Sequence, residues 1–149
     1  MARNNVRPGW QSCVMATITL SAGDDLVERL AAEADPVRAV IELVWNGLDA
    51  DADHVAVSLQ RNEAGGVVGV TVRDDGHGMS PEGIDHDFRW VGNSWKRNTR
   101  VSLTKGRPMH GRFGQGRLRA FALGTHIKWE TVAKDTEGKL RRTTISSST

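Results

Sequence analysis

Apolar residues recur at helical spacing in the segment 35–50. The stripe consists of Val37, Ile41, Val44 and Leu48. This spacing places four apolar side chains on one face of a helix, so we expect that face to pack in the core. Asp35 and Pro36 predict the start of the helix, because aspartate is a favoured N-cap and proline suits the first helical position.

A period of two replaces the helical period in the next two apolar segments, 55–60 and 68–73. Such alternation predicts two strands, which the turn-forming residues 62–66 would join. Extending the second strand by one step puts Asp74 on the same inward face as Val68, Val70 and Val72. A carboxylate facing inward is costly unless a group donates to it, and the neighbouring glycines leave space for a ligand.

The remaining chain predicts further short elements and one long irregular connection. We expect residues 1–15 to be disordered, and the ordered domain to cover 16–149 with an edge strand at 17–20. Other patterns predict helices at 21–34, after Ser80 and at 113–123, and strands at 126–132 and 140–145. No periodicity survives from 92 to 111, and a connection of that length is typical of a lid.

Composition limits the class of protein and its setting. The chain has 149 residues, enough for one domain. No apolar run approaches the roughly 20 residues of a membrane span, and no signal-peptide pattern precedes the first expected helix. Cys13 is the single cysteine, which excludes an intrachain disulfide and fits a cytoplasmic location.

Basic residues are concentrated in one window of the chain. Between 88 and 129 there is no acidic residue, yet ten of the 20 lysines and arginines lie there. One interpretation is a segment that faces phosphates or nucleic acid. The other is a solvated basic surface without a ligand. We favour the first, because the window includes the Gly-rich segment 111–116.

Three oxygen-bearing side chains form a polar stripe on the helix predicted at 35–50. Glu42, Asn46 and Asp49 stand at positions i, i+4 and i+7, and small Ala50 follows them. Asn46 suits Mg²⁺, a hard cation that takes few protein ligands beside waters and phosphates. Glu42 would then orient an attacking water and accept its proton, while Asp49 would hold a water or a nearby backbone group. The alternative is an ordinary polar helix face.

Two glycine-containing motifs follow. Asp74 could accept a hydrogen bond from an exocyclic amine such as that of adenine, and Gly76 and Gly78 would let a base lie against the main chain. Gly114 and Gly116 could expose backbone N–H groups to phosphate at a helix N-terminus, with Gln115 as a further donor. Each motif alone is weak, because glycines also serve tight turns and close packing. The chain has no Walker A sequence.

Taken in order, these motifs resemble those of the GHKL superfamily of ATPases, which has the Bergerat fold. Glu42, Asn46, Asp49 and Ala50 match its first motif. The second motif is matched by Asp74, Gly76 and Gly78, with Met79 closing the run, and the third by the segment from Gly111 to Gly116. The resemblance covers about residues 20 to 145. The presence of Glu42 makes the chaperone, MutL and MORC-like branch the most similar.

The resemblance implies an α/β (α+β) two-layer sandwich, with a mixed, mainly antiparallel sheet, helices on one face and an ATP lid. It implies that Glu42 is the general base, that Asn46 is the Mg²⁺ ligand and that Asp74 reads adenine. It also implies phosphate contacts, which would come from Gly114, Gln115 and Gly116 and from the lid-start residues Ser94 and Lys96.

The resemblance further implies that ATP closes the lid and brings two such domains together as a dimer, with DNA or a protein as a further partner. The sequence departs from the family pattern in two respects. The family usually supplies a phosphate-contacting lysine from a following domain, and this sequence ends at Thr149. The family also has a threonine near adenine, and either Thr143 or Thr144 could correspond to it. We therefore expect a domain truncated at its C-terminus that hydrolyses ATP slowly; the alternative is a non-catalytic ATP-binding or nucleic-acid-binding module.

Overall fold

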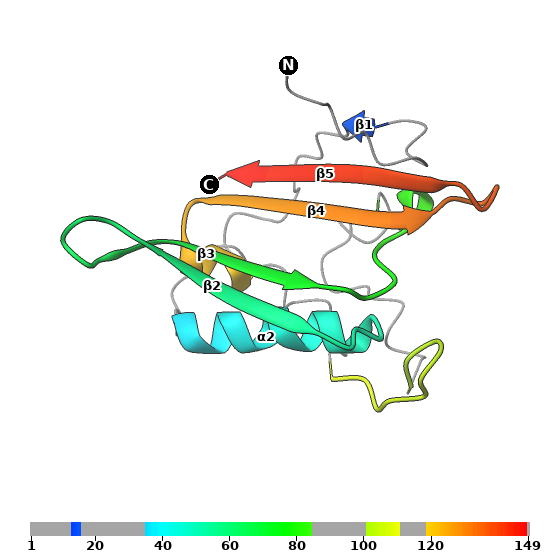
Figure 1. Cartoon of the computed structure of the whole chain (residues 1–149), viewed down its shortest axis with the longest axis horizontal. Helices are drawn as coiled ribbons and strands as arrows, with labels where there is room; N and C mark the ends of the chain where they lie inside the picture. The colour runs from blue at the N-terminus through cyan, green and yellow to red at the C-terminus, as the bar shows by residue number, and fades with distance from the viewer. Residues whose placement is uncertain (1–12, 16–34, 85–100, 111–118, 149) are drawn as a thin grey trace, which may run out of the picture.

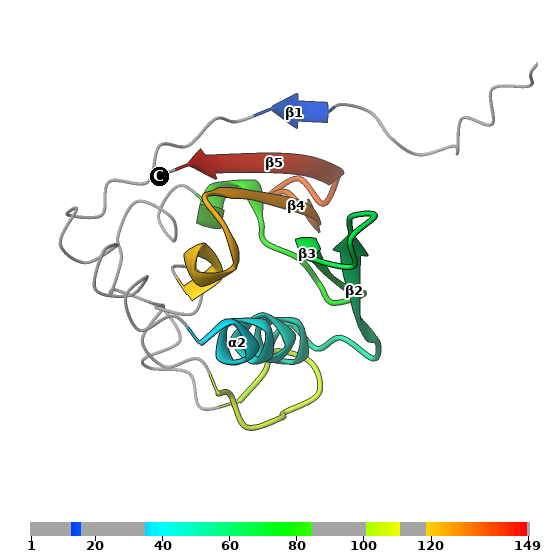
Figure 2. The same cartoon turned by 90° about the vertical axis from the view of Figure 1, so that its left-hand side faces the viewer.

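The computed structural model describes residues 13–15, 35–84, 101–110 and 119–148 (Figure 1). The helices and strands whose bounds fall within these ranges are β1 (Cys13–Met15), α2 (Pro36–Asp49), β2 (Val55–Arg61), β3 (Val67–Asp74), η2 (Ala120–Leu123), β4 (His126–Lys134) and β5 (Leu140–Ser148). Residues 81–84 are helical as well. Helix α2 lies on one side of the strands, and η2 lies between α2 and β4 (Figure 2). The predicted mixed α/β (α+β) class is confirmed.

The described strands form two hydrogen-bonded sheets, although the resemblance implied a single one. In the first, β5 lies between β1 and β4, parallel to β1 and antiparallel to β4. The second is the antiparallel hairpin of β2 and β3. After Asp74 the chain turns at Gly76 and Gly78 toward β4. The contacts of this turn with β4 connect the two sheets, since no β3–β4 pairing is found among the described strands.

The start of α2 agrees with the prediction, but its predicted core face does not. The Asp35 carboxylate accepts hydrogen bonds from the N–H groups of Val37 (2.9 Å) and Arg38 (3.2 Å). Val37 is 66% exposed and Ile41 is 48% exposed, whereas Ala39 is 1% exposed. At about 100° per residue, those two apolar side chains lie roughly opposite Ala39. Val44 and Leu48, the other half of the predicted stripe, are half-buried. Gly47 is buried against Asp74 and Val55, where the absence of a side chain lets the helix approach the strands closely.

The β2–β3 hairpin forms as predicted, with its turn at 62–66. Asn62 shapes the turn by accepting a hydrogen bond from the Gly66 N–H (2.8 Å), and Gly65 adopts φ +82°. The predicted inward face is buried only near α2: Val70 and Val72 are half-buried, but Val68 is 65% exposed. The tip of the hairpin extends past the end of α2 (Figure 1), so nothing in α2 covers it.

A small core links the helical turn at 81–84 to the β4–β5 sheet. Ile84 and Ile145 are fully buried, and Met79 and Trp129 pack against them. Ser80 caps the turn as predicted, since its hydroxyl accepts a hydrogen bond from the Gly83 N–H (3.1 Å). The predicted strands at 126–132 and 140–145 are confirmed as β4 and β5.

Several predictions fall elsewhere. The strand at 17–20, the helix at 21–34, half of the lid predicted at 92–111 and most of the helix at 113–123 lie outside the described residues. The last three residues of the segment predicted to be disordered form β1 instead. No helix in the described ranges is long and apolar enough to cross a membrane.

Candidate functional site

The first and second motifs meet where Gly47 of α2 lies against Asp74 at the end of β3. A Cβ atom at position 47 would lie 2.9 Å from the Asp74 Cβ and 3.0 Å from a methyl group of Val55. Those distances are too short for a side chain, so only glycine fits here without movement. Asp74 is therefore directed toward α2 as predicted, but it is exposed and not buried with the valines.

One oxygen of Asp74 holds the turn that follows it. Its Oδ1 accepts a hydrogen bond from the Gly76 N–H (3.0 Å). No hydrogen bond to Oδ2 is found within the described ranges, so this oxygen can accept from a ligand. A Cβ at Gly76 would lie 3.0 Å from Oδ1 and 2.6 Å from the Ala50 carbonyl oxygen. The missing side chain keeps this face of the carboxylate open.

Backbone contacts join Ala50 to the same turn. The Ala50 carbonyl accepts a hydrogen bond from the His77 N–H (2.9 Å). The Ala50 methyl group lies close to Gly76, where a Cβ would be 2.9 Å away. A larger residue at either position would separate α2 from the second motif.

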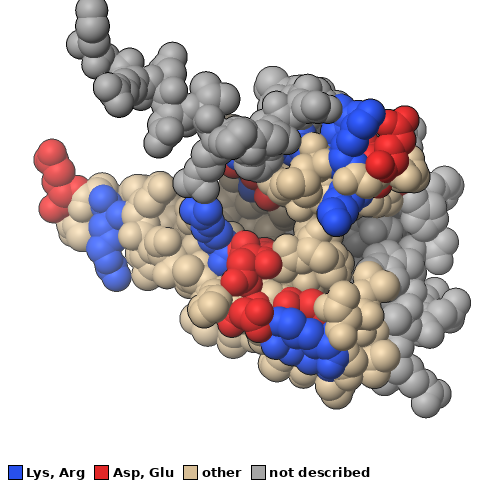
Figure 3. Space-filling model, turned by 45° about the vertical axis from the view of Figure 1, so that its right-hand side comes forward, with Lys and Arg blue, Asp and Glu red and all other residues tan. Residues whose placement is uncertain are grey.

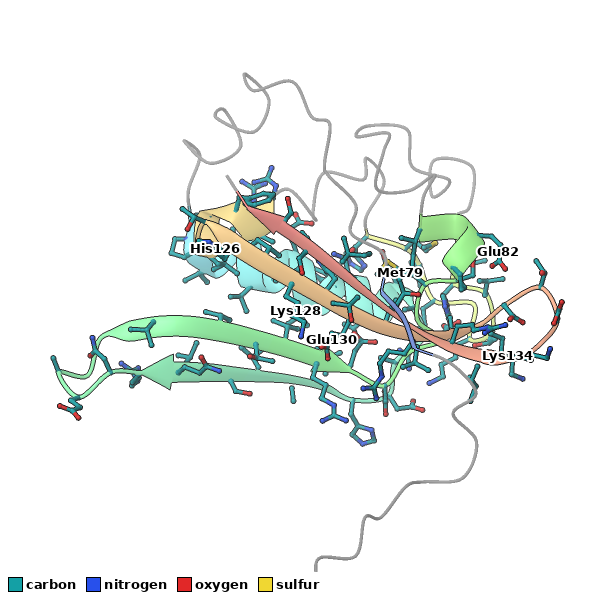
Figure 4. All side chains as sticks on the ribbon, turned by 90° about the horizontal axis from the view of Figure 1, so that it is seen from above. Met79, Glu82, His126, Lys128, Glu130 and Lys134 are labelled. Atoms are coloured by element: carbon teal, nitrogen blue, oxygen red, sulfur yellow. The ribbon has the colours of Figure 1, made fainter. Side chains whose placement is uncertain are left out.

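Strand β4 supports the end of the second motif. The Thr131 hydroxyl accepts a hydrogen bond from the Met79 N–H (2.9 Å), and Gly78, at φ +71°, has no room for a Cβ beside the Val132 carbonyl. Figure 4 shows Met79 beside β4. Thr131 is 8% exposed and pairs across the sheet with Thr143, which is 4% exposed. Thr143 thus lies on the buried face nearest this motif; its contact with adenine stays a prediction, as does that of Thr144.

Glu42 and Asn46 lie one turn apart on α2, and both are half-buried. Neither side chain makes a hydrogen bond or an ion pair within the described part of the chain. Their polar atoms can therefore bind a water or a cation. The same ranges contain no group of three or more histidine, cysteine or acidic side chains that could hold a metal, so any divalent ion here needs other ligands as well.

Asp49 holds a backbone group, which is one of the two arrangements that the sequence predicted. Its side chain is 4% exposed, and Oδ1 accepts a hydrogen bond from the His110 N–H (3.0 Å). The His110 ring stacks on Trp45 of α2, with ring centroids 3.4 Å apart and planes 14° apart. Because His110 directly precedes Gly111, α2 holds the residue from which the chain enters the third motif.

Asp75 joins the hairpin strands beside the site, a role that sequence reasoning missed. Its Oδ1 accepts from the N–H groups of Asp53 (2.7 Å) and His54 (2.9 Å), and Oδ2 lies 2.9 Å from His54 Nδ1. Hydrogen bonds from the His54 backbone and ring lower the pKa of Asp75 to about 2.

Several cations of the basic window have acidic partners. Lys105 Nζ lies 2.5 Å from Asp53 Oδ1, and Arg107 lies 3.7 Å from the same oxygen. Lys128 Nζ lies 2.5 Å from Glu130 Oε1 on β4. Acidic and basic side chains accordingly gather side by side on the face in Figure 3. For these three cations the contacts favour a surface of ion pairs over an anion-binding surface.

Six predicted site residues lie outside the described ranges: Ser94, Lys96, Gly111, Gly114, Gln115 and Gly116. Of the predicted site, the structure therefore brings together the first motif, the second motif and the entry to the third.

A family model described as histidine kinase-, DNA gyrase B- and HSP90-like ATPase matches residues 34–148. The chain belongs to this family of GHKL-like ATPases. The match covers both motifs whose contact is described above, and it confirms the predicted family.

Three similar proteins extend the comparison. The chain is 41% identical over 73 residues to the DNA mismatch repair protein MutL of Desulforamulus reducens, which is 49% of this chain and 10% of that protein. It is 43% identical over 68 residues to MutL of Exiguobacterium sibiricum, covering 44% and 11%. It is 32% identical over 87 residues to the putative type II restriction enzyme HgiDII of Herpetosiphon aurantiacus, covering 58% and 13%.

The matched part of the chain thus spans about a tenth of the length of these relatives. No solved structure gives a significant match.

Proposed function

We propose that this GHKL-like domain binds ATP with Mg²⁺ and hydrolyses it slowly, and that the nucleotide controls association with a second copy. The observation that supports this best is the contact of Asp74 with Gly47. It unites the residues expected to read the base with those expected to face the phosphates.

The adenine side of the site is formed by Asp74 and its glycines. Oδ2 of Asp74 is available to accept a hydrogen bond from the exocyclic amine of adenine, because Oδ1 already binds the Gly76 N–H. Gly76 and Gly78 leave main chain exposed, against which a flat base can lie. A guanine would present a carbonyl oxygen at the same position, so a carboxylate there favours adenine.

The phosphate side begins one turn away on α2. The Asn46 side-chain oxygen is the proposed protein ligand of Mg²⁺, which when bound would neutralise phosphate charge and orient the outermost phosphate. Glu42 positions the attacking water and accepts its proton. Both side chains have the freedom this needs, since nothing in the described ranges binds them.

The remaining proposed contacts belong to the third motif and the lid. Gly111, Gly114, Gln115 and Gly116 would bind phosphate oxygens through N–H groups, and Ser94 and Lys96 would approach them from the lid start. The hydrogen bond from the His110 N–H to Asp49 supports the contacts proposed for the third motif, because it fixes the residue before Gly111 against α2.

A DNA-linked role is proposed from the relatives, since two of them are named as mismatch repair proteins and one as a putative restriction enzyme. The domain would then act in the cytoplasm as the nucleotide-dependent part of a DNA-processing system. Direct DNA binding by this domain is the second candidate, and the basic window is the feature that favours it. A steep salt dependence of DNA affinity in the absence of ATP would support that candidate.

The adenine assignment is tested with Asp74→Asn. Replacing one oxygen by an amide donor places a donor against the adenine amine, so ATP binding measured by calorimetry should be lost. Asp135→Asn is a matched control, because Asp135 lies at the β4–β5 turn and holds Arg141 and not the motifs. Undiminished ATP affinity in Asp74→Asn would remove the assignment.

The catalytic assignment is tested with Glu42→Ala. Loss of the base should slow phosphate release by roughly 10²–10⁴-fold and leave ATP affinity nearly unchanged. Product formation is followed over hours with and without Mg²⁺. An equal loss of binding and hydrolysis would show that Glu42 has a structural role, and hydrolysis unchanged by the substitution would support the non-catalytic alternative.

A further inference from the structure

Asp51 stands two residues after the end of α2, in an unusual setting for a carboxylate. It is 8% exposed, and its backbone adopts φ +63°, the left-handed region that L-residues other than asparagine and aspartate rarely occupy. No motif in the sequence includes it. A buried charge at a strained backbone position persists only when its surroundings hold it.

The segment 101–110 supplies the donors for this carboxylate. Asp51 Oδ2 accepts hydrogen bonds from the N–H (2.7 Å) and the hydroxyl (2.8 Å) of Thr104, and Oδ1 accepts from the Lys105 N–H (3.3 Å). Burial raises the pKa of Asp51, but hydrogen bonds from Ser102, Thr104 and Lys105 outweigh it and keep the pKa well below its usual range. The carboxylate is therefore ionised, and both of its oxygens are used.

The same segment is closed on itself, so it can dock as a unit. Val101 and Pro108 form an isolated bridge, the Ser102 N–H donates to the Arg107 carbonyl (2.8 Å), and the Ser102 hydroxyl accepts from the Arg107 N–H (2.9 Å). Two further contacts tie it to the residues after α2. Arg107 donates to the Ala52 carbonyl (2.7 Å), and Lys105 pairs with exposed Asp53.

The docked segment ends at the site. His110 is its last residue, and its N–H and ring bind Asp49 and Trp45 on the helix that carries Glu42 and Asn46. Helix α2 therefore holds the segment at its last residue, His110, and Asp51 holds it at Thr104 and Lys105. Without the contacts of Asp51, only those of His110 and the more exposed partners would remain.

We propose that Asp51 is a positioning residue for nucleotide phosphate: it clamps the segment 101–110 to the end of α2, and so fixes His110 and the point at which the chain enters the Gly-rich third motif. The inference rests on the proposed function. Asp51 touches no ligand itself, and it acts on the phosphate side of the site, whereas Asp74 acts on the base.

Asp51→Asn is the sharpest test, because asparagine tolerates the same φ and has nearly the same shape. It replaces one accepting oxygen with a donor, which opposes the Thr104 or Lys105 donors. ATP affinity by calorimetry should fall about tenfold or more, since a buried acceptor is lost, while affinity for adenosine stays within about twofold. Glu63→Gln is the control, since Glu63 lies in the exposed turn between β2 and β3; it should change neither affinity.

A second readout does not involve nucleotide. Trypsin should cleave after Lys105 faster in Asp51→Asn than in the wild-type protein or in Glu63→Gln, as mass spectrometry of the fragments would show. Thr104→Val, which removes one donor and leaves Asp51 in place, should change cleavage and ATP affinity in the same direction by a smaller amount. It also serves if Asp51→Asn fails to fold.

Equal losses of ATP and adenosine affinity in folded Asp51→Asn, or unchanged ATP affinity, would overturn the proposal. So would an unchanged cleavage rate after Lys105. If wild-type protein binds no ATP, the proposed function fails by itself, and the protease experiment still reports whether Asp51 holds the segment.

Discussion

Single residues with small side chains decide how closely the motifs of this domain approach one another. Gly47 brings α2 against Asp74, and Ala50 with Gly76 brings the end of α2 against the second motif. At both glycine positions an added Cβ would meet an atom closer than ordinary van der Waals contact. The polar side chains carry the proposed chemistry, but these small residues set the distances between them.

Gly47→Ala is expected to destabilise the domain and weaken ATP binding. Alanine raises helix propensity by about 1 kcal/mol relative to glycine. The new Cβ would press on the Asp74 Cβ and on Val55, and overpacking of this kind costs roughly 1–3 kcal/mol. The overpacking should prevail, so the urea midpoint should fall and calorimetry should show weaker binding of ATP.

Gly124→Ala is the control for that substitution, because a Cβ there would meet nothing within 4 Å. Gly124→Ala should change neither the urea midpoint nor the affinity for ATP appreciably. An increase in stability in Gly47→Ala, with ATP affinity retained, would show that the contact between α2 and Asp74 has enough slack to admit a methyl group.

At the scale of elements, loops and strand ends are held by carboxylates that accept backbone N–H groups. Asp35 caps α2, Asp75 joins the start of β2 to the end of β3, and Asp51 holds the segment 101–110. Such hydrogen bonds stabilise the ionised carboxylate, so these joints weaken when the group is protonated.

The Asp75 joint predicts a pH dependence of stability. Its pKa falls from 3.8 to about 2 on folding, because His54 donates to it from its backbone and ring. A lowered pKa means that the stabilisation is complete above about pH 4 and is lost as the pH falls toward about 2. Asp75→Asn should therefore melt at a lower temperature than wild type at neutral pH, and the difference should shrink between those pH values.

Thermal melts followed by circular dichroism from pH 7 to pH 2 measure that difference. Glu63→Gln is a suitable control, since Glu63 lies in the exposed turn between β2 and β3. If the difference in melting temperature between Asp75→Asn and wild type stayed constant through this pH range, the ionised Asp75 carboxylate would not be what holds the strand ends together.

At the scale of the molecule, α2 and the two sheets place the candidate site at their junction. The second motif leaves β3, passes Ala50 of α2 and reaches β4 at Thr131, so it contacts every layer. A ligand at this junction would bind groups from several elements at once. Its binding energy can therefore stabilise one arrangement of the layers over others.

We expect ATP with Mg²⁺ to shift the protein from monomer to dimer. Sedimentation should show the mass rising from that of a 16.3 kDa chain toward twice that value when ATP is saturating. Glu42→Ala should accumulate the dimer, because it binds ATP but hydrolyses it slowly, and Asp74→Asn should stay monomeric. A wild-type protein that remains monomeric at saturating ATP would contradict this expectation.

The sequence by itself determined α2, the β2–β3 hairpin, β4 and β5, the cap of α2 and the hairpin turn, and the family. Those features depend on neighbouring residues: Asp35-Pro36 begins α2, residues 62–66 form the hairpin turn, and the motif spacing identifies a GHKL-like ATPase. The site roles predicted for Glu42 and Asn46 stay predictions, although their side chains have the freedom those roles require.

Only the tertiary structure decided which side of α2 packs and what holds the site together. Of the predicted apolar stripe, Val37 and Ile41 are exposed and Val44 and Leu48 are half-buried, whereas the close contact with β3 is made at Gly47. The sequence also did not predict the burial of Asp51 or the acidic partners of Lys105 and Arg107. These pairs are about 50 residues apart in sequence, and local patterns carry no information on which distant groups become neighbours.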